Sequence, residues 1–199
     1  MREAGVLMPV SALPSRVGAG ELGESAFHFI ELLKKNHVRI WQILPLNPVG
    51  YGNSPYQPYS SCAGDDIYIS LDTLAEEGLL KKSPMLFLEK CKKVDYERVR
   101  QYREPYLRAA FMAFVEQKGY EKPEYKEFCC SILGSMKYGV FRALKKANNG
   151  ACWNEWPEED RTWLRTDTYW IQSQRQKQDT RCSSVYFLYP VDESKESCQ

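Results

Sequence analysis

The side chains best suited to chemistry gather in one stretch of the sequence, residues 41–66. The stretch combines tyrosines and a hydroxyl group with prolines and glycines, which leave a loop little chain entropy to lose on ordering. A tyrosine offers a flat apolar face with a hydroxyl at its rim, which is what a sugar ring needs for stacking and hydrogen bonding. The pattern is typical of carbohydrate binding, and also of a loop that only packs its own tyrosines. The residues concerned are Tyr51, Ser54, Pro55, Tyr56 and Tyr59.

The segment ahead of this loop predicts a strand, a helix and a second strand within residues 4–46. Residues 5–10 and 38–46 are short apolar runs of the kind found in buried parallel strands. Between them, apolar residues recur with the period of a helix, at Ala26, Phe29, Ile30 and Leu33. A crossover of this length implies that the two strands are parallel.

The loop itself resembles a known family. From Trp41 the sequence reads W-Q-x-L-P-L-x-P-x-G-Y-G-x-S-P-Y-Q-x-x-S-x-x-A-G, which is similar to the signature of the 4-alpha-glucanotransferases (amylomaltase, or disproportionating enzyme). The resemblance extends over residues 4–172 and implies an α/β fold, with the first βαβ unit of a (β/α)8 barrel followed by a helical insertion. The tyrosines then lie at the C-terminal face, where barrel enzymes place their sites. Further matching pieces occur at residues 5–7, 13–15, 94–96, 110–111 and 153–157, and at Gly18, Gly20 and Gly23.

The resemblance implies an enzyme that needs no cofactor and transfers α-1,4-glucan segments between maltooligosaccharides by a retaining double displacement. Ser54, Pro55 and Tyr56 match the family's donor-side contacts, and Tyr51 is a candidate for a peripheral glucan contact. The family's catalytic carboxylates lie on later barrel strands, so we expect no catalytic residue and an incomplete barrel in this chain. The alternative is a non-catalytic truncated product that is either inert or a weak glucan-binding module.

Two carboxylates, Asp65 and Asp66, follow the loop and suggest general acid and base chemistry. The resemblance assigns their place to scaffold and loop, and we interpret both as structural. Residues 18–23 spell G-x-G-x-x-G, but they stand well after the strand, and no acidic residue ends the second strand. We therefore reject dinucleotide binding.

The composition narrows the remaining function classes. The chain has 199 residues, of which 43% are hydrophobic and 27% charged, with a net charge of +1. A near-neutral protein lacks the field that polyphosphates attract, so we predict no nucleic-acid partner. No apolar run reaches the roughly 20 residues of a membrane span, and no signal peptide opens the chain. The two histidines make a His-rich metal site unavailable, and the seven cysteines contain no Cys-x-x-Cys pair. We interpret the thiols, including Cys152, as reduced core groups of a cytoplasmic protein.

Later segments are mainly helical in pattern. The predicted elements are a strand at residues 67–71, a helical turn broken at Gly78, a long helix beginning near Pro105, and another helix over residues 127–147. We interpret the charged residues there, including Arg98, Arg100 and Arg103, as a solvated helix face. The four tryptophans favour core packing over a sugar platform. They are Trp153, Trp156, Trp163 and Trp170.

Three parts follow from these patterns: a βαβ part with the tyrosines at residues 1–71, a helical insertion at 72–172, and a tail at 173–199. The tail is polar, has no helical period and contains Pro190. Codons allowed for residues 189–192 can spell Thr-Gln-Trp-Met when shifted by one base, and the resembled family has a Gln-Trp pair there. We predict an aberrant, disordered tail from a frameshifted or prematurely ended reading frame, which sequencing of the locus tests.

Overall fold

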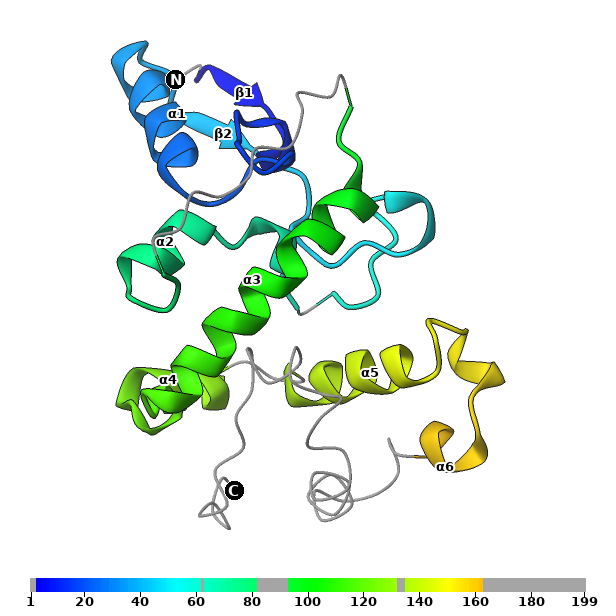
Figure 1. The fold of residues 1–199 in the computed structure, drawn as a ribbon. Coiled ribbons are helices and arrows are strands. Elements are labelled where there is room, and N and C mark those ends of the chain that lie inside the picture. The colour runs from blue at the N-terminus through cyan, green and yellow to red at the C-terminus, as the bar shows by residue number, and fades with distance from the viewer. Residues whose placement is uncertain (1–2, 62, 82–92, 132–134, 163–199) are drawn as a thin grey trace. The chain divides into compact units, whose positions relative to one another are not determined.

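The computed structural model describes residues 3–61, 63–81, 93–131 and 135–162 (Figure 1). The chain divides into two compact units, residues 1–110 and 111–199, and each is considered by itself. The division lies inside helix α3 (Tyr96–Glu116). The three parts predicted from the sequence stay a prediction, and the predicted tail lies outside the described residues.

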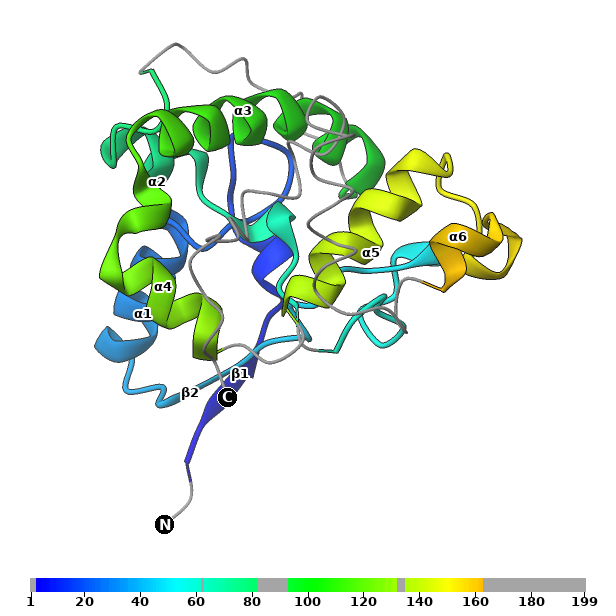
Figure 2. The same ribbon diagram turned by 90° about the horizontal axis from the view of Figure 1, so that it is seen from below.

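The first unit begins with a strand, a helix and a parallel strand (Figure 1, Figure 2). Strand β1 (Gly5–Leu7) pairs with β2 (Ile40–Gln42), and the register aligns Val6 with Trp41. Both strands are shorter than predicted. The last rung runs from Met8 N to Gln42 O (3.0 Å). Beyond it, prolines follow each strand, and a proline has no N–H with which to continue a ladder.

Helix α1 (Glu24–Lys35) joins the two strands and packs on them. An acidic residue in its first turn and two lysines in its last complement the helix dipole. The ring of Phe29 meets Trp41 edge to face, with centroids 5.1 Å apart. The buried centre of this cluster consists of Val10, Leu13 and Ala26.

The strand predicted at residues 67–71 is wrong. The chain instead forms a short 3-10 turn (Asp66–Tyr68) and then helix α2 (Leu71–Glu76). The side chain of Asp65 accepts from Ile67 N (3.1 Å), and that of Ser70 accepts from Thr73 N (3.3 Å). Such caps satisfy the backbone locally and favour turns and helix starts over a strand, despite the alternating apolar pattern.

The predicted start of the long helix near Pro105 is also wrong, because α3 begins nine residues earlier, at Tyr96, and contains Pro105. Asp95 starts the helix by accepting from Arg98 N at its side chain (3.1 Å) and from Val99 N at its carbonyl (3.0 Å). A proline inside a helix removes one backbone hydrogen bond. The first half of α3 is held by contacts of Arg100 and Arg103, which are described below.

Where the sequence predicted a single helix over residues 127–147, the structure describes two helical stretches, one on each side of residues 132–134. They are α4 (Pro123–Ser131) and α5 (Ser135–Ala147). The predicted end of the second helix is confirmed: Asn149 and Gly150 have φ values of 53° and 77°, the left-handed conformation that terminates helices. The short helix α6 (Glu158–Arg161) follows.

The tryptophans and the cysteine of this unit differ in burial. Trp156 is 3% exposed and packs with Leu144, as expected for a core residue, whereas Trp153 is 59% exposed. Trp163 and Trp170 lie outside the described residues. Cys152 is an exposed free thiol, so its predicted burial is wrong. It stands just before the 3-10 turn Trp153–Glu155, where the backbone is extended and the side chain is not enclosed.

Candidate functional site

The residues predicted to bind sugar lie on one long loop that leaves the C-terminal end of β2. We call residues 47–65 the tyrosine loop (Figure 1). Because β1 and β2 are parallel, the segment after β1 starts at the same edge of the sheet. The loop therefore stands where α/β folds place their ligands, beyond the carboxyl ends of parallel strands.

Backbone hydrogen bonds close the tyrosine loop on itself. Val49 and Pro58 form an antiparallel bridge, and Gly52, at φ 81°, turns the chain near the tip. The side-chain amide of Asn47 also donates to Ala63 O (2.9 Å). The loop is thus a closed hairpin-like structure anchored at both ends. The main rungs run from Asp65 N to Leu46 O (2.8 Å), from Tyr59 N to Pro48 O (2.9 Å) and from Gly50 N to Gln57 O (3.3 Å).

The tip of the loop presents Tyr56. Ser54 is extended, with φ −77° and ψ 123°, the conformation expected of a residue that precedes proline. Its carbonyl accepts from Gln57 N (3.1 Å), and its hydroxyl accepts from Tyr56 N (3.4 Å). The Tyr56 side chain is 71% exposed, so its ring is open to a ligand.

The other predicted binding residues lie on the same loop. Ser54 and Pro55 are half-buried, and Tyr59, which was not assigned a binding role, is 45% exposed. The backbone of Tyr51 begins a short 3-10 turn (Tyr51–Asn53), and its side chain lies outside the described structure. The loop thus brings Ser54, Pro55 and Tyr56 together at its tip, and their binding role stays a prediction.

An ion pair fixes the base of the loop. Arg100 of α3 donates to both carboxylate oxygens of Asp65, at 2.8 and 2.6 Å, and to Asp66 at 3.0 Å. Asp65 is only 5% exposed and also accepts from the backbone N–H groups of Val49 (3.4 Å) and Ile67 (3.1 Å). The bidentate geometry gives the pair both strength and a defined orientation.

The electrostatics of Asp65 agree with a structural role. Burial acts to raise its pKa, but the hydrogen bond and charge of Arg100, with the Ile67 N–H, outweigh burial, so the pKa is lowered. A carboxyl group held ionised and surrounded by donors is unsuited to deliver a proton at neutral pH. The interpretation of Asp65 as scaffold therefore fits its surroundings.

Arg103, a second arginine of α3, is buried, so the prediction that the charged residues of this segment form a solvated helix face is wrong for it. The side chain of Arg103 is 1% exposed, donates to Glu21 (2.9 Å) and also bonds the carbonyl of Ile69. Glu21 in turn accepts from the Ser70 hydroxyl (3.2 Å). Arginines 100 and 103 are three apart in α3 and therefore share one helix face. The spacing groups the two charges on one face, but it does not show which distant residue each of them contacts.

The glycines at residues 18–23 are explained by packing. A Cβ on Gly20 would overlap the carbonyl of Val10 and the backbone of Leu13, and one on Gly23 would stand 2.6 Å from the Ser70 hydroxyl. These glycines let the segment after β1 lie close to its neighbours, so the G-x-G-x-x-G pattern has a structural cause. Rejection of the dinucleotide site is consistent with this packing.

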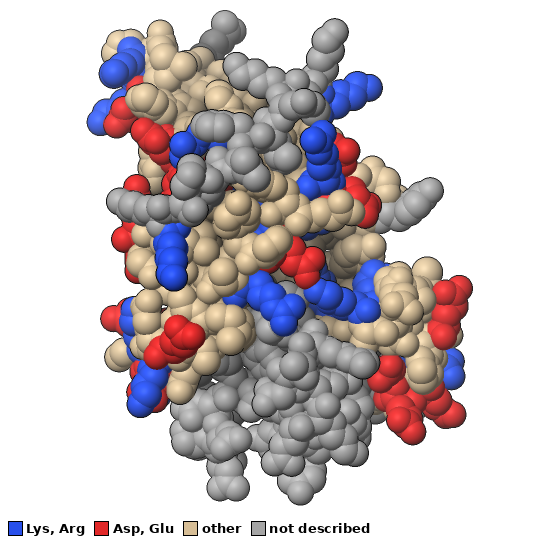
Figure 3. Space-filling view, viewed as in Figure 1, with Lys and Arg blue, Asp and Glu red and all other residues tan. Residues whose placement is uncertain are grey.

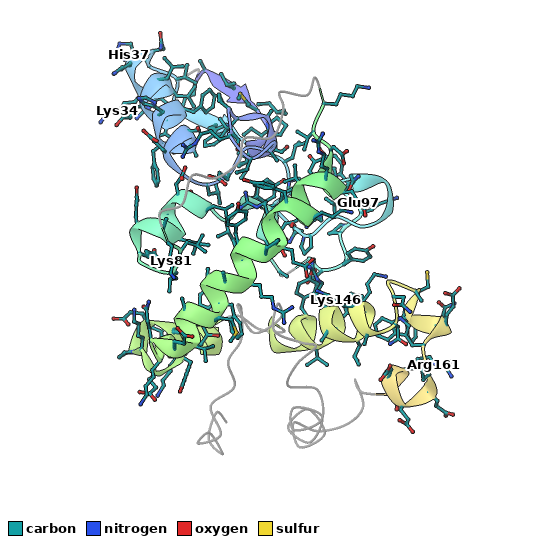
Figure 4. The ribbon with its side chains drawn as sticks, in the orientation of Figure 1. Lys34, His37, Lys81, Glu97, Lys146 and Arg161 are labelled. Carbon is teal, nitrogen blue, oxygen red and sulfur yellow. The ribbon has the colours of Figure 1, made fainter. Side chains whose placement is uncertain are left out.

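A cavity of about 460 Å³ lies at the other end of β2 from the loop. Its polar lining residues are Lys34 and His37, both labelled in Figure 4, and Arg39. This lining includes no carboxylate or side-chain amide to hold sugar hydroxyls. We therefore place the candidate site at the tyrosine loop. The apolar lining consists of Ile30, Leu33, Val38 and Trp41.

Metal sites and membrane-spanning helices can also be judged in the described part of the chain. Its His, Cys, Asp and Glu side chains form no group of three or more that could hold a metal ion. None of the helices that the structure describes has the length and apolar character to cross a membrane. Charges of both signs are interspersed on the face shown in Figure 3. Such a surface suits a neutral ligand as well as a charged one.

Comparison with known proteins identifies the family. The family model described as 4-alpha-glucanotransferase matches residues 8–194, a range that includes much of the predicted tail. Relatives named 4-alpha-glucanotransferase are 39% identical over 88% of this chain in Synechocystis sp. and 38% identical over 78% in Thermus thermophilus. The chain spans 35% and 31% of those two proteins, about a third of their length.

A solved structure, the amylomaltase from Streptococcus agalactiae in complex with acarbose, is also similar. It superposes with a TM-score of 0.82 at 28% identity, and the match covers 95% of this chain and 39% of that one. The fold is therefore that of part of an amylomaltase. Taken with the family match, these likenesses show that the chain belongs to the 4-alpha-glucanotransferase family.

Proposed function

We propose that this chain contributes α-1,4-glucan binding to a 4-alpha-glucanotransferase, through the tip of the tyrosine loop. The observation that carries the proposal is the 71% exposed ring of Tyr56 on a loop closed by backbone hydrogen bonds at the C-terminal end of β2. An exposed aromatic ring on a rigid support binds a sugar face with little loss of conformational entropy. Family membership supports maltooligosaccharides as the ligand class.

The same proposal assigns the first two strands of a (β/α)8 barrel to β1 and β2. Their parallel pairing, with α1 as the crossover, supports that assignment. In such a barrel the tyrosine loop faces the mouth, where the glucan lies. Ser54 and Pro55 then set the position of the Tyr56 ring, and Tyr51 makes a peripheral contact.

The proposed chemistry is a retaining transfer. One carboxylate attacks the anomeric carbon while a second carboxyl group protonates the leaving oxygen. The second group, now a carboxylate, then takes the proton of a new glucan hydroxyl, whose oxygen displaces the first carboxylate. The two acidic residues at the end of the loop, Asp65 in it and Asp66 just after it, are held by Arg100 and serve the scaffold. We therefore propose that these 199 residues bind glucan and take their catalytic carboxylates from sequence outside this chain.

A binding and activity experiment tests this proposal. Purified chain is titrated with maltoheptaose by calorimetry and incubated with maltotriose, with glucose and longer oligomers measured. We expect saturable binding that Tyr56→Ala weakens and Phe128→Ala leaves unchanged, because Phe128 is an exposed aromatic of the other unit. Glucose release above a blank would show that this chain carries its own catalytic groups. Absence of binding would remove the proposed function.

A further inference from the structure

The tyrosine loop is anchored by a residue far from it in sequence. Arg100 lies 35 residues beyond Asp65, on α3, and contacts both oxygens of that carboxylate. Asp65 is itself the last residue of the loop and connects with its beginning, since it accepts from Val49 N (3.4 Å) and donates from its own N–H to Leu46 O (2.8 Å). Asp65 thus links the two ends of the loop, and its side chain connects them to Arg100 on α3.

The chain of contacts continues from this base toward the tip. Val49 bridges Pro58 across the loop, and Gly50 N donates to Gln57 O (3.3 Å). Gln57 follows Tyr56 directly and its N–H is bonded to Ser54 O (3.1 Å). A shift of Asp65 therefore moves the strand of the loop that carries the aromatic ring.

Arg100 and Arg103, both on α3, have separate tasks. Arg103 bonds Glu21 and the carbonyl of Ile69, both outside the tyrosine loop, and so holds the fold of the unit. Arg100 bonds Asp65 and Asp66, and its side chain is 30% exposed. Because Arg100 is less enclosed than Arg103, we expect its loss to disturb the loop more than the core of the unit.

We propose that Arg100 is a positioning residue that holds the tyrosine loop, through Asp65, in the conformation that binds glucan. The ligand in this inference rests on the proposed function. The clamp, by which we mean the Arg100–Asp65 ion pair, rests on the geometry of the described residues. Without the guanidinium, Asp65 is a buried carboxylate that has lost its cationic partner. The carboxylate then either binds a water molecule or becomes protonated. Either change loosens the hydrogen bonds that link Asp65 to Val49 and Leu46.

The test compares Arg100→Ala and Arg100→Lys with Arg98→Ala in the full 199-residue chain. Arg98 is an exposed arginine of the same helix and serves as the matched control. Three quantities are measured: hydrogen exchange of the loop amides of Gly50, Tyr59 and Asp65, the dissociation constant for maltoheptaose, and the thermal unfolding midpoint. Hydrogen exchange of the loop amides without ligand shows whether the Arg100–Asp65 pair holds the loop. The dissociation constant shows whether that pair affects the binding of maltoheptaose.

We expect Arg100→Ala to speed exchange of the loop amides and raise the dissociation constant by roughly 10- to 100-fold, the effect of losing hydrogen bonds to a charged group. Arg100→Lys retains the charge but not the bidentate fork, so it should fall between wild type and alanine. Arg98→Ala should match wild type in all three measurements. Helix amides of α1 should exchange equally in every variant, since Asp65 and Asp66, the carboxylates that Arg100 bonds, lie outside α1.

Each outcome decides a different part of the inference. Equal loop exchange and equal affinity in Arg100→Ala and Arg98→Ala overturn the positioning role. Faster loop exchange in a chain that never binds maltoheptaose supports the clamp and overturns the proposed function. If Arg100→Ala unfolds, the lysine variant decides: an intermediate affinity with an unchanged midpoint supports the role, and wild-type affinity with wild-type exchange overturns it.

Discussion

The guanidinium of Arg103 lies 2.9 Å from the carboxylate of Glu21 and ties α3 to the segment between β1 and α1. Their side chains are 1% and 13% exposed, so the pair is withdrawn from water. One turn earlier, Arg100 ties the same helix to the tyrosine loop. A single helix face therefore fixes both segments that leave the C-terminal edge of the sheet.

The first prediction concerns this buried pair. Arg103→Ala removes the guanidinium that bonds the Glu21 carboxylate and the Ile69 carbonyl, so we expect the free energy of unfolding to fall by about 3–5 kcal/mol. Arg108→Ala, an exposed arginine of α3, should change it by about 0.5 kcal/mol or less. Urea denaturation measures both. Equal stability of the two variants contradicts the assignment of Arg103 as an anchor.

A second prediction separates the two possible uses of Tyr56. If its ring stacks on sugar, Tyr56→Ala should lose about 1–3 kcal/mol of binding free energy for maltoheptaose, and Tyr56→Phe should lose little. If the hydroxyl positions the sugar, Tyr56→Phe should weaken binding as well. Calorimetric titration measures both, and the unfolding midpoint must stay near wild type because the ring is 71% exposed. Full affinity in Tyr56→Ala would show that the loop is not the binding element.

The third prediction is a dependence on pH. The pKa of Asp65 is lowered from its ordinary value of 3.8, because Arg100 and the Ile67 N–H outweigh the effect of burial. Stability from this group is fully present above pH 3.8 and is lost as the pH falls through the lowered value. The difference in unfolding free energy between wild type and Asp65→Asn should be constant from about pH 5 to 7 and shrink in stronger acid.

The groups that face Asp65 define the control for this measurement. Arg100 stays charged throughout that range, whereas Asp66, the other carboxylate on Arg100, also titrates in acid. The measurement is therefore repeated in Asp66→Asn, where the same acid loss at Asp65 should remain. Tyr68, whose pKa burial raises to about 12, stays neutral. A difference that grows toward low pH contradicts the sign of this prediction.

A fourth prediction concerns close packing after β1. Gly20→Ala places a methyl group on the carbonyl of Val10 and the backbone of Leu13, so we expect a loss of about 1–3 kcal/mol in the free energy of unfolding. Gly64→Ala is the matched control, since a Cβ there has nothing within 4 Å. Thermal denaturation distinguishes them. Equal midpoints would mean that the segment after β1 relaxes without cost.

Short sequence patterns correctly predicted the elements whose conformation depends on residues close together in the sequence. The helical period of residues 24–35 identified α1 and the parallel crossover, and Pro55 fixed the extended backbone of Ser54. The alternation at residues 67–71 misled, because capping by Asp65 and Ser70 satisfies the backbone there. The burial of Arg103 was missed for another reason. Its partner Glu21 is 82 residues away, and no local pattern shows which charge finds a distant partner.

The long sequence separation of the Arg100–Asp65 pair also bears on the order of folding. A chain made from its N-terminus exposes the tyrosine loop before α3, since 35 residues separate the two partners. Contacts between distant residues form late because chain entropy must be lost before they are made. The loop therefore stays open while β1, α1 and β2 collapse, and its closure should coincide with the docking of α3 in refolding kinetics.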